Sequence, residues 1–166
     1  MKTLVTYFSQ TGKTKLVAEA IFGVIQGDKE IKAFDEVDGL DGYDLTFIGF
    51  PIIAFGPAKQ GKDFLEKYAA GRKAALFITH AAPENQEGLD LWLDKCREAA
   101  AGTDLLGMFD CRGELSEPIA EFLLKSDDPI MRAFGERRQE TLGQPDETRL
   151  QRARDFAKKI MGKATK

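Results

Sequence analysis

Hydroxyl and glycine residues gather directly after the first apolar segment of the chain. Ser9, Thr11 and Thr14 can donate hydrogen bonds to phosphate oxygens. A helical pattern begins within this run, and the free N–H groups at a helix N-terminus favour a bound anion. An ordinary helix cap would need only one hydroxyl. The run therefore predicts an anion site whose members are Ser9, Gln10, Thr11, Gly12, Lys13 and Thr14.

This anion site does not match the common nucleotide-binding patterns. Gly12-Lys13-Thr14 resembles the end of G-x-x-x-x-G-K-[ST], but the first glycine of that pattern would fall at Tyr7, inside the predicted strand. A G-x-G-x-x-G for a dinucleotide pyrophosphate is also absent. These two mismatches exclude a nucleotide triphosphatase and a dinucleotide-binding fold.

Two further loops follow predicted strands and are unusually apolar. They are PIIAFGP at 51–57 and THAAP at 79–83. Open α/β sheets bind ligands at the carboxyl ends of their parallel strands, so these loops are expected beside a ligand. Ile52, Ile53 and Phe55 could form one wall of a flat pocket. His80, the only histidine, is either held by a backbone carbonyl or charged beside the ligand.

Strands alternating with helices must position these loops. The predicted strands cover residues 4–8, 30–34, 44–50, 73–79 and 105–109, and the helices between and after them cover about 16–25, 62–70, 84–101 and 146–161. The strands are almost continuously apolar, as in parallel sheets buried on both faces. The pattern predicts a doubly wound α/β fold in one domain, residues 1–166, with Trp92 on the inner face of its helix.

The alternation breaks after the fifth strand, at about residues 114–144, here called the insertion. Short helices are predicted at 117–124 and 129–134, and residues 135–145 are expected to be polar and loose. The insertion is a candidate lid or docking surface beside the ligand.

The segment Tyr7-Phe8-Ser9-Gln10-Thr11-Gly12-Lys13-Thr14 resembles the phosphate loop of flavodoxins, whose pattern is T/S-x-T-G-x-T. The resemblance implies a three-layer sandwich around a five-stranded parallel sheet of order 2-1-3-4-5, with FMN as cofactor. By the resemblance, residues 9–14, here called the phosphate loop, hold the FMN phosphate. The flavin ring would lie between the other two loops, against Pro51, Ile52, Ile53, Ala54, Phe55, Gly56, Thr79, His80, Ala81 and Ala82.

The resemblance also implies finer roles. Gly56 would contact the flavin N5 region through its backbone, and His80 would lie near the N1–C2=O edge. Many flavodoxins enclose the ring between a tryptophan and a tyrosine, whereas the loop at 79–83 has no aromatic residue besides His80. The flavin is therefore expected to be less enclosed on that side.

The chain resembles in particular a subgroup of small flavodoxin-like proteins common in anaerobic bacteria. The features that carry this resemblance are the Cys-x-Gly turn at 111–113, the insertion, and the helix cap Pro145-Asp146-Glu147. Cys111, Arg112 and Gly113 thereby join the candidate flavin site. Cys111 also fits a buried small residue, and Arg112 a solvated surface group.

The sequence leaves three candidate functions, of which two are redox functions. The first is an FMN electron carrier that serves a redox partner protein; some members of the subgroup are thought to supply electrons to flavin-dependent reductases. The second is an FMN-dependent reductase of a small acceptor such as a quinone or tetrapyrrole. A flavodoxin-fold module without flavin is the third. No Ser-His-Asp order, metal-ligand spacing or carboxylate pair is present, which favours the carrier.

The charge distribution and the cysteine content indicate which kinds of binding partner and which cellular compartment to expect. The net charge is −3, with +6 on residues 149–166 and −9 on the remainder, so an acidic body carries a basic last helix. This balance does not predict a nucleic-acid binder. Cys96 and Cys111 form no C-x-x-C pair, which fits a reducing compartment without a bound metal. We expect a cytoplasmic protein without membrane segments, as a monomer or weak dimer.

Overall fold

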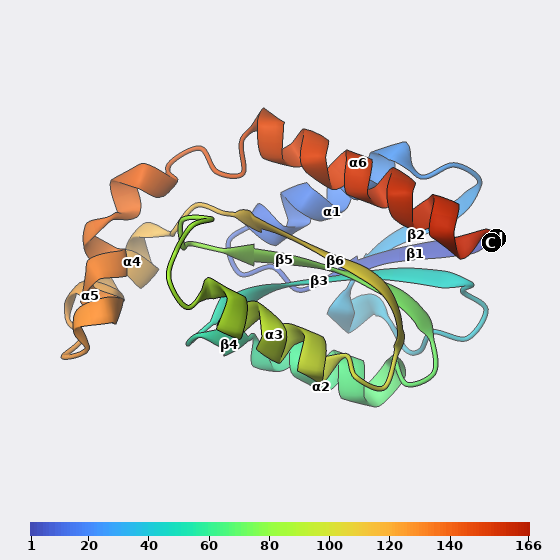
Figure 1. The fold of residues 1–166 in the computed structure, drawn as a ribbon, viewed down its shortest axis with the longest axis horizontal. Helices are drawn as coiled ribbons and strands as arrows, with labels where there is room; N and C mark the ends of the chain where they lie inside the picture. The colour runs from blue at the N-terminus through green and yellow to red at the C-terminus, as the bar shows by residue number, and fades with distance from the viewer.

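Five long parallel strands form the sheet of the computed structural model, which describes residues 1–166 (Figure 1). They are β1 (Lys2–Tyr7), β2 (Asp28–Ala33), β3 (Leu45–Ile53), β5 (Lys73–His80) and β6 (Asp104–Arg112). Their order is β2-β1-β3-β5-β6, which confirms the order predicted for five strands in sequence. Buried apolar side chains on both faces stabilise β1, β3 and β5, as their near-continuous apolar runs predicted, whereas the edge strand β2 has no buried residue.

Strand β3 continues past the predicted end at Pro51 and turns back on itself. Residues Ile52 and Ile53 pair with the short antiparallel strand β4 (Gly56–Pro57). The turn between them places Ala54 at φ 52° and Phe55 at φ 64°, a backbone region that side chains disfavour. Such residues cost about 1–3 kcal/mol each and occur mostly at functional sites.

Helices cover both faces of the sheet, so the fold has three layers (Figure 1). Helices α1 (Lys13–Val24) and α6 (Glu147–Ala164) pack on one face of the sheet. Helices α2 (Lys59–Tyr68) and α3 (Leu89–Ala99) lie on the other face. A short 3-10 turn, Phe34–Glu36, follows β2. The predicted helix 84–101 begins only at Leu89, because Pro83 is followed by two turns and by Gly88 at φ 88°. None of the helices has the length and apolar character needed to cross a membrane.

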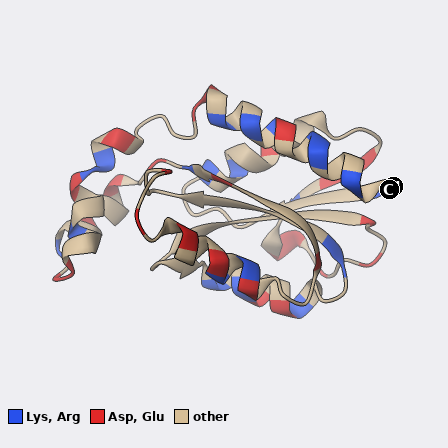
Figure 2. Cartoon of the chain, in the orientation of Figure 1, with Lys and Arg blue, Asp and Glu red and all other residues tan.

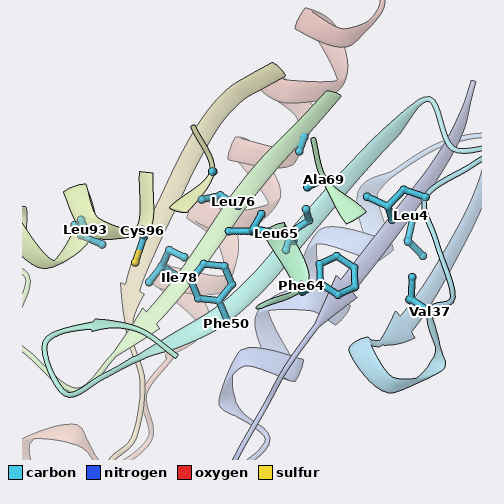
Figure 3. Close-up of a cluster of buried hydrophobic side chains, with 14 of the residues drawn as sticks. Leu4, Val37, Phe50, Phe64, Leu65, Ala69, Leu76, Ile78, Leu93 and Cys96 are labelled. Atoms are coloured by element: carbon cyan, nitrogen blue, oxygen red, sulfur yellow. The ribbon is translucent and has the colours of Figure 1, made fainter. Parts of the chain in front are cut away.

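The apolar core consists of two clusters separated by the sheet. Leu4, Phe50 and Ile78 face α2 and α3 (Figure 3), whereas Val5 and Phe77 belong to the cluster under α1 and α6. Leu4 and Val5 separate in this way because successive strand residues point to opposite faces. The sheet is therefore rigidly held on both sides, which fixes the loops at its carboxyl edge.

The insertion contains α4 (Glu117–Leu124), α5 (Pro129–Glu136) and a 3-10 turn at Arg138–Thr141. Helices α4 and α5 pack mainly on each other and project beyond the end of the sheet (Figure 1). The prediction of a loose segment at 135–145 was wrong: the buried Thr141 hydroxyl accepts from the Leu115 amide (2.9 Å) and donates to the Arg138 carbonyl (2.6 Å). The insertion is thus closed at its base by hydrogen bonds.

Basic residues recur along α6, as Figure 2 shows. Several of them are paired within the molecule: Arg149 and Arg152 both contact Glu84, at 3.0 and 3.1 Å, and Arg154 contacts Glu147. The two contacts with Glu84 join the start of α6 to the segment before α3, whereas the Arg154–Glu147 pair lies within α6. The basic helix thereby offsets part of the acidic charge of the body.

Candidate functional site

A cavity of about 390 Å³ lies at the carboxyl ends of β1, β3, β5 and β6. Its volume is in the range of small-molecule sites. It brings together fourteen of the predicted site residues: Gln10, Thr11, Lys13, Thr14, Pro51, Ile52, Ile53, Ala54, Phe55, Thr79, His80, Ala81, Ala82 and Gly113. The five predicted residues that do not line it are Ser9, Gly12, Gly56, Cys111 and Arg112.

The phosphate loop has backbone donors that no protein group satisfies, and all of them except the Ser9 amide belong to residues that line the cavity. The N–H groups of Ser9, Gln10, Thr11, Lys13 and Thr14 donate to no acceptor in the protein. Ser9 itself is turned inward, because its Oγ accepts from the Gly12 amide at 3.0 Å and from the Lys15 amide at 3.3 Å. Gly12, at φ 87°, makes the turn into α1. Backbone amides gathered in this way form an anion-binding nest.

A buried hydroxyl pair joins the phosphate loop to the strand on which the next loop begins. The Oγ1 atoms of Thr14 and Thr79 lie 2.8 Å apart, and both residues are buried. Each hydroxyl can donate as well as accept, so one of the two retains a hydrogen for another acceptor. The pair fixes the distance between the anion-binding end and the 79–83 loop.

His80 is buried and bonded at both ring nitrogens. Nδ1 lies 2.9 Å from the Ala82 carbonyl oxygen, and Nε2 lies 2.9 Å from Asp110 Oδ2. The carbonyl oxygen can only accept, so the hydrogen bond to Ala82 requires a proton on Nδ1. Asp110 is the partner of the other ring nitrogen. His80 thus has the backbone carbonyl partner of one sequence alternative, and a charged ring beside the flavin stays a prediction.

The 79–83 loop is held by its carbonyl groups, which leaves its amides available. Arg112 Nε donates to the Ala81 carbonyl at 3.0 Å, beside the His80 bond to Ala82. The N–H groups of Ala81 and Ala82 donate to no acceptor in the protein. They can therefore donate to an acceptor atom of a ligand. Arg112 supports the loop without lining the cavity.

Three aromatic side chains, here called the aromatic triad, form one wall. The ring of Phe55 lies 5.0 Å from Trp92 and 6.4 Å from Phe134, and Trp92 lies 6.1 Å from Phe134. Trp92 packs against the apolar core cluster, as its predicted inward position implies, and it also lines the cavity. Phe134 supplies from the insertion an aromatic group that the 79–83 loop lacks.

The cysteines lie outside the cavity. Cys111 is fully buried in β6, and burial raises the pKa of its thiol to about 12. Burial likewise raises the pKa of Cys96 to about 12. Cys111 fits the alternative of a small core residue. The adjacent Gly113 lines the cavity, and a Cβ there would lie 3.5 Å from Lys13 Cβ.

The insertion provides a second apolar wall; the sequence placed this segment beside the ligand but named none of its residues as site residues. The lining residues from it are Leu115, Ser116, Ile119, Phe122, Leu123, Met131 and Phe134, together with Glu114 at its base. Ile119, Phe122 and Leu123 follow the i, i+3, i+4 spacing of one helix face. That spacing was the available signal, but it does not say which surface the helix faces.

Comparison with known proteins identifies the fold. The family model of the flavodoxin domain matches residues 4–158. The chain belongs to the flavodoxin family. This flavodoxin is also 34% identical to the flavodoxin-like domain-containing protein BilS of Clostridioides difficile (strain CD3), across 99% of both chains.

Solved structures agree with this family. A flavodoxin from the domain Archaea superposes with a TM-score of 0.63 at 19% identity, over 100% of both chains, which shows the shared fold. A flavoprotein from Lactobacillus acidophilus NCFM in complex with FMN has a TM-score of 0.53 and 25% identity, over 66% of this flavodoxin and 92% of that chain.

The cavity of this flavodoxin fits FMN. Five free amides and the Thr11 and Thr14 hydroxyls suit a phosphate group at one end. The aromatic triad and Ile52 offer apolar surface to a flat ring at the other. The amides of Ala81 and Ala82 suit ring acceptor atoms. When bound, FMN supplies the redox chemistry, and these residues bind and orient it.

Proposed function

We propose that this flavodoxin uses FMN to carry electrons between redox enzymes, with a partner protein docked at the cavity mouth. The observation that carries this proposal is that every titratable side chain lining the cavity already has a partner. Lys13 pairs with Glu114 at 3.3 Å, and His80 pairs with Asp110. A general acid or base needs a group free to reach the substrate. Electron transfer needs none, because the flavin itself performs the chemistry.

An exposed apolar side chain at the cavity supports a protein partner. Phe122 on α4 lines the cavity and is 72% exposed. Exposed apolar surface beside a binding site is a feature of interaction surfaces. We further propose that a basic partner docks there, guided by the acidic body, so that its binding weakens as salt rises.

A second candidate is an FMN-dependent reductase of a small acceptor such as a quinone or tetrapyrrole. The observation that favours it is the apolar wall formed by Ile119, Leu123 and Met131, which faces the cavity from the insertion. Such a wall could hold a flat apolar acceptor against the flavin. This candidate differs from the carrier in needing turnover without a partner protein.

Reduction of the purified, FMN-loaded protein separates these candidates. We expect dithionite titration to show two separate one-electron steps and NADH or NADPH to reduce the protein slowly without a partner. Direct two-electron reduction with rapid NADH- or NADPH-driven turnover of a quinone would support the reductase instead. A colourless protein that FMN cannot reconstitute would refute both candidates. We also propose that the protein is a cytoplasmic monomer or weak dimer; sedimentation of the purified protein would test its oligomeric state.

A further inference from the structure

An ion pair connects the phosphate loop to the base of the insertion. Lys13 Nζ lies 3.3 Å from Glu114 Oε2, and the two side chains are 28% and 25% exposed. Both residues line the cavity. Lys13 is the first residue of α1, so its backbone amide also belongs to the anion-binding nest. The only ammonium group at this end of the cavity is thus held by a carboxylate.

Glu114 also closes the insertion at its base. Its Oε1 accepts from the Gly143 amide at 3.2 Å, and its own amide donates to the Gln144 carbonyl at 2.8 Å. The Gly143 amide and, to a smaller extent, Lys13 hold the pKa of the Glu114 carboxyl below its ordinary value. Glu114 is therefore an anion at neutral pH and is fixed at the cavity by contacts that do not depend on Lys13.

A phosphate bound by the phosphate loop would bring a second anion to the same ammonium group. A phosphate monoester carries about −1.5 to −2 charges at pH 7, more than a carboxylate. Both anions attract Lys13 and repel each other. The phosphate also has the five free amides of the loop as donors, whereas Glu114 keeps its bond to Gly143.

We propose that Lys13 exchanges Glu114 for the phosphate when FMN binds, and that Glu114 thereby limits how strongly the site prefers FMN over riboflavin. The proposal rests on FMN being the cofactor, as proposed above, but not on the choice between carrier and reductase. Glu114 acts as a specificity-determining residue, because its charge opposes only a ligand that carries phosphate. Riboflavin has the same ring and ribityl chain without that charge.

Three single variants of the full chain test this exchange. Glu114→Gln removes the charge but keeps the side-chain length and an acceptor for Gly143. Lys13→Met removes the ammonium group. Glu117→Gln is the matched control, since Glu117 is an exposed acid three residues further along that does not line the cavity. Dissociation constants for FMN and riboflavin would be measured by the quenching of flavin fluorescence on addition of flavin-free protein.

We expect Glu114→Gln to bind FMN about three- to tenfold more tightly and Lys13→Met about tenfold more weakly, as for partly screened charges. Riboflavin affinity should stay within about twofold of the wild type in every variant, because riboflavin carries no phosphate. Glu117→Gln should match the wild type for both flavins, because this exposed acid does not line the cavity. The exchange would be overturned if the ratio of the FMN and riboflavin dissociation constants were the same in Glu114→Gln and the wild type. Weaker FMN binding by Glu114→Gln would overturn it as well. Either result would leave the cofactor assignment intact. A wild-type protein that binds neither flavin would overturn both.

Discussion

The aromatic triad is expected to hold the α4–α5 pair against the body, and Phe134→Ala tests this directly. Helices α4 and α5 pack mainly on each other, and Phe134 joins them to Phe55 and Trp92. Burying a phenylalanine side chain fully contributes about 1.5–3 kcal/mol, so the half-buried Phe134 contributes about 1–1.5 kcal/mol. Two aromatic contacts near the outer limit of the favourable range add about 0.5 kcal/mol each.

Phe134→Ala should therefore weaken the docking of α4 and α5 by about 2 kcal/mol, which raises the opening equilibrium about 30-fold. The hydrogen bonds at the base of the insertion, from Arg138 to Leu115 and between Leu115 and Thr141, do not involve this ring. The opening should accordingly be local and leave the sheet intact.

Amide hydrogen exchange measures this opening. Amides of α4 and α5 should exchange about 30-fold faster in Phe134→Ala, while those of β3 and β5 keep their wild-type rates. Acrylamide should also quench the fluorescence of Trp92, the only tryptophan, more strongly. The matched control is Phe122→Ala, because Phe122 is 72% exposed and its loss should change exchange by less than about twofold. Unchanged exchange in Phe134→Ala, or equal changes in both variants, would refute the anchoring role of the triad.

Three further results are expected. Gly49→Ala should lower the free energy of unfolding in urea by about 1–3 kcal/mol or more, since its Cβ would lie 1.9 Å from a phenyl ring of β5. Gly23→Ala has open space around its Cβ and should raise the free energy of unfolding by about 0.5–1 kcal/mol. Equal stabilities of the two variants would contradict this packing. Cys96 and Cys111 should resist alkylation at pH 8 until the protein unfolds, because burial raises both pKa values to about 12; rapid labelling of the native protein would show that they are accessible. His80→Ala should lower the potential of the second electron, because it removes an imidazole that lines the cavity and leaves the Asp110 carboxyl group without its partner; an unchanged potential in a redox titration would count against a location of His80 near the flavin.

The phosphate loop and the alternation of strands and helices were predictable because their signals are local, whereas the strand order followed from the resemblance to flavodoxins. The loop lies within six consecutive residues, so its hydroxyls, its glycine and the helix start that they precede are visible together. The strands are short apolar runs, and the helices between them allow parallel pairing with right-handed crossovers. The positive φ angles of Ala54 and Phe55 were not predictable, since neither residue type favours them.

The sequence did not show which side chains contact the predicted site residues. Asp110 reaches His80 because β5 and β6 pair in one register, with His80 opposite Arg112. A shift of one residue would turn the Asp110 side chain to the other face of the sheet. Sequence reasoning named His80 but could not name Asp110 as the partner of its ring.

The sequence by itself determined the fold class, the anion-binding loop and the two loops beside it, because each depends on a continuous segment and on the carboxyl edge shared by parallel strands. Only the tertiary structure decided what encloses the cavity. Phe55, Trp92 and Phe134 are about 40 residues apart from one to the next, and Lys13 meets Glu114 across most of the chain. Contacts of this kind depend on helix rotation and strand register, which packing sets and local residue patterns do not encode.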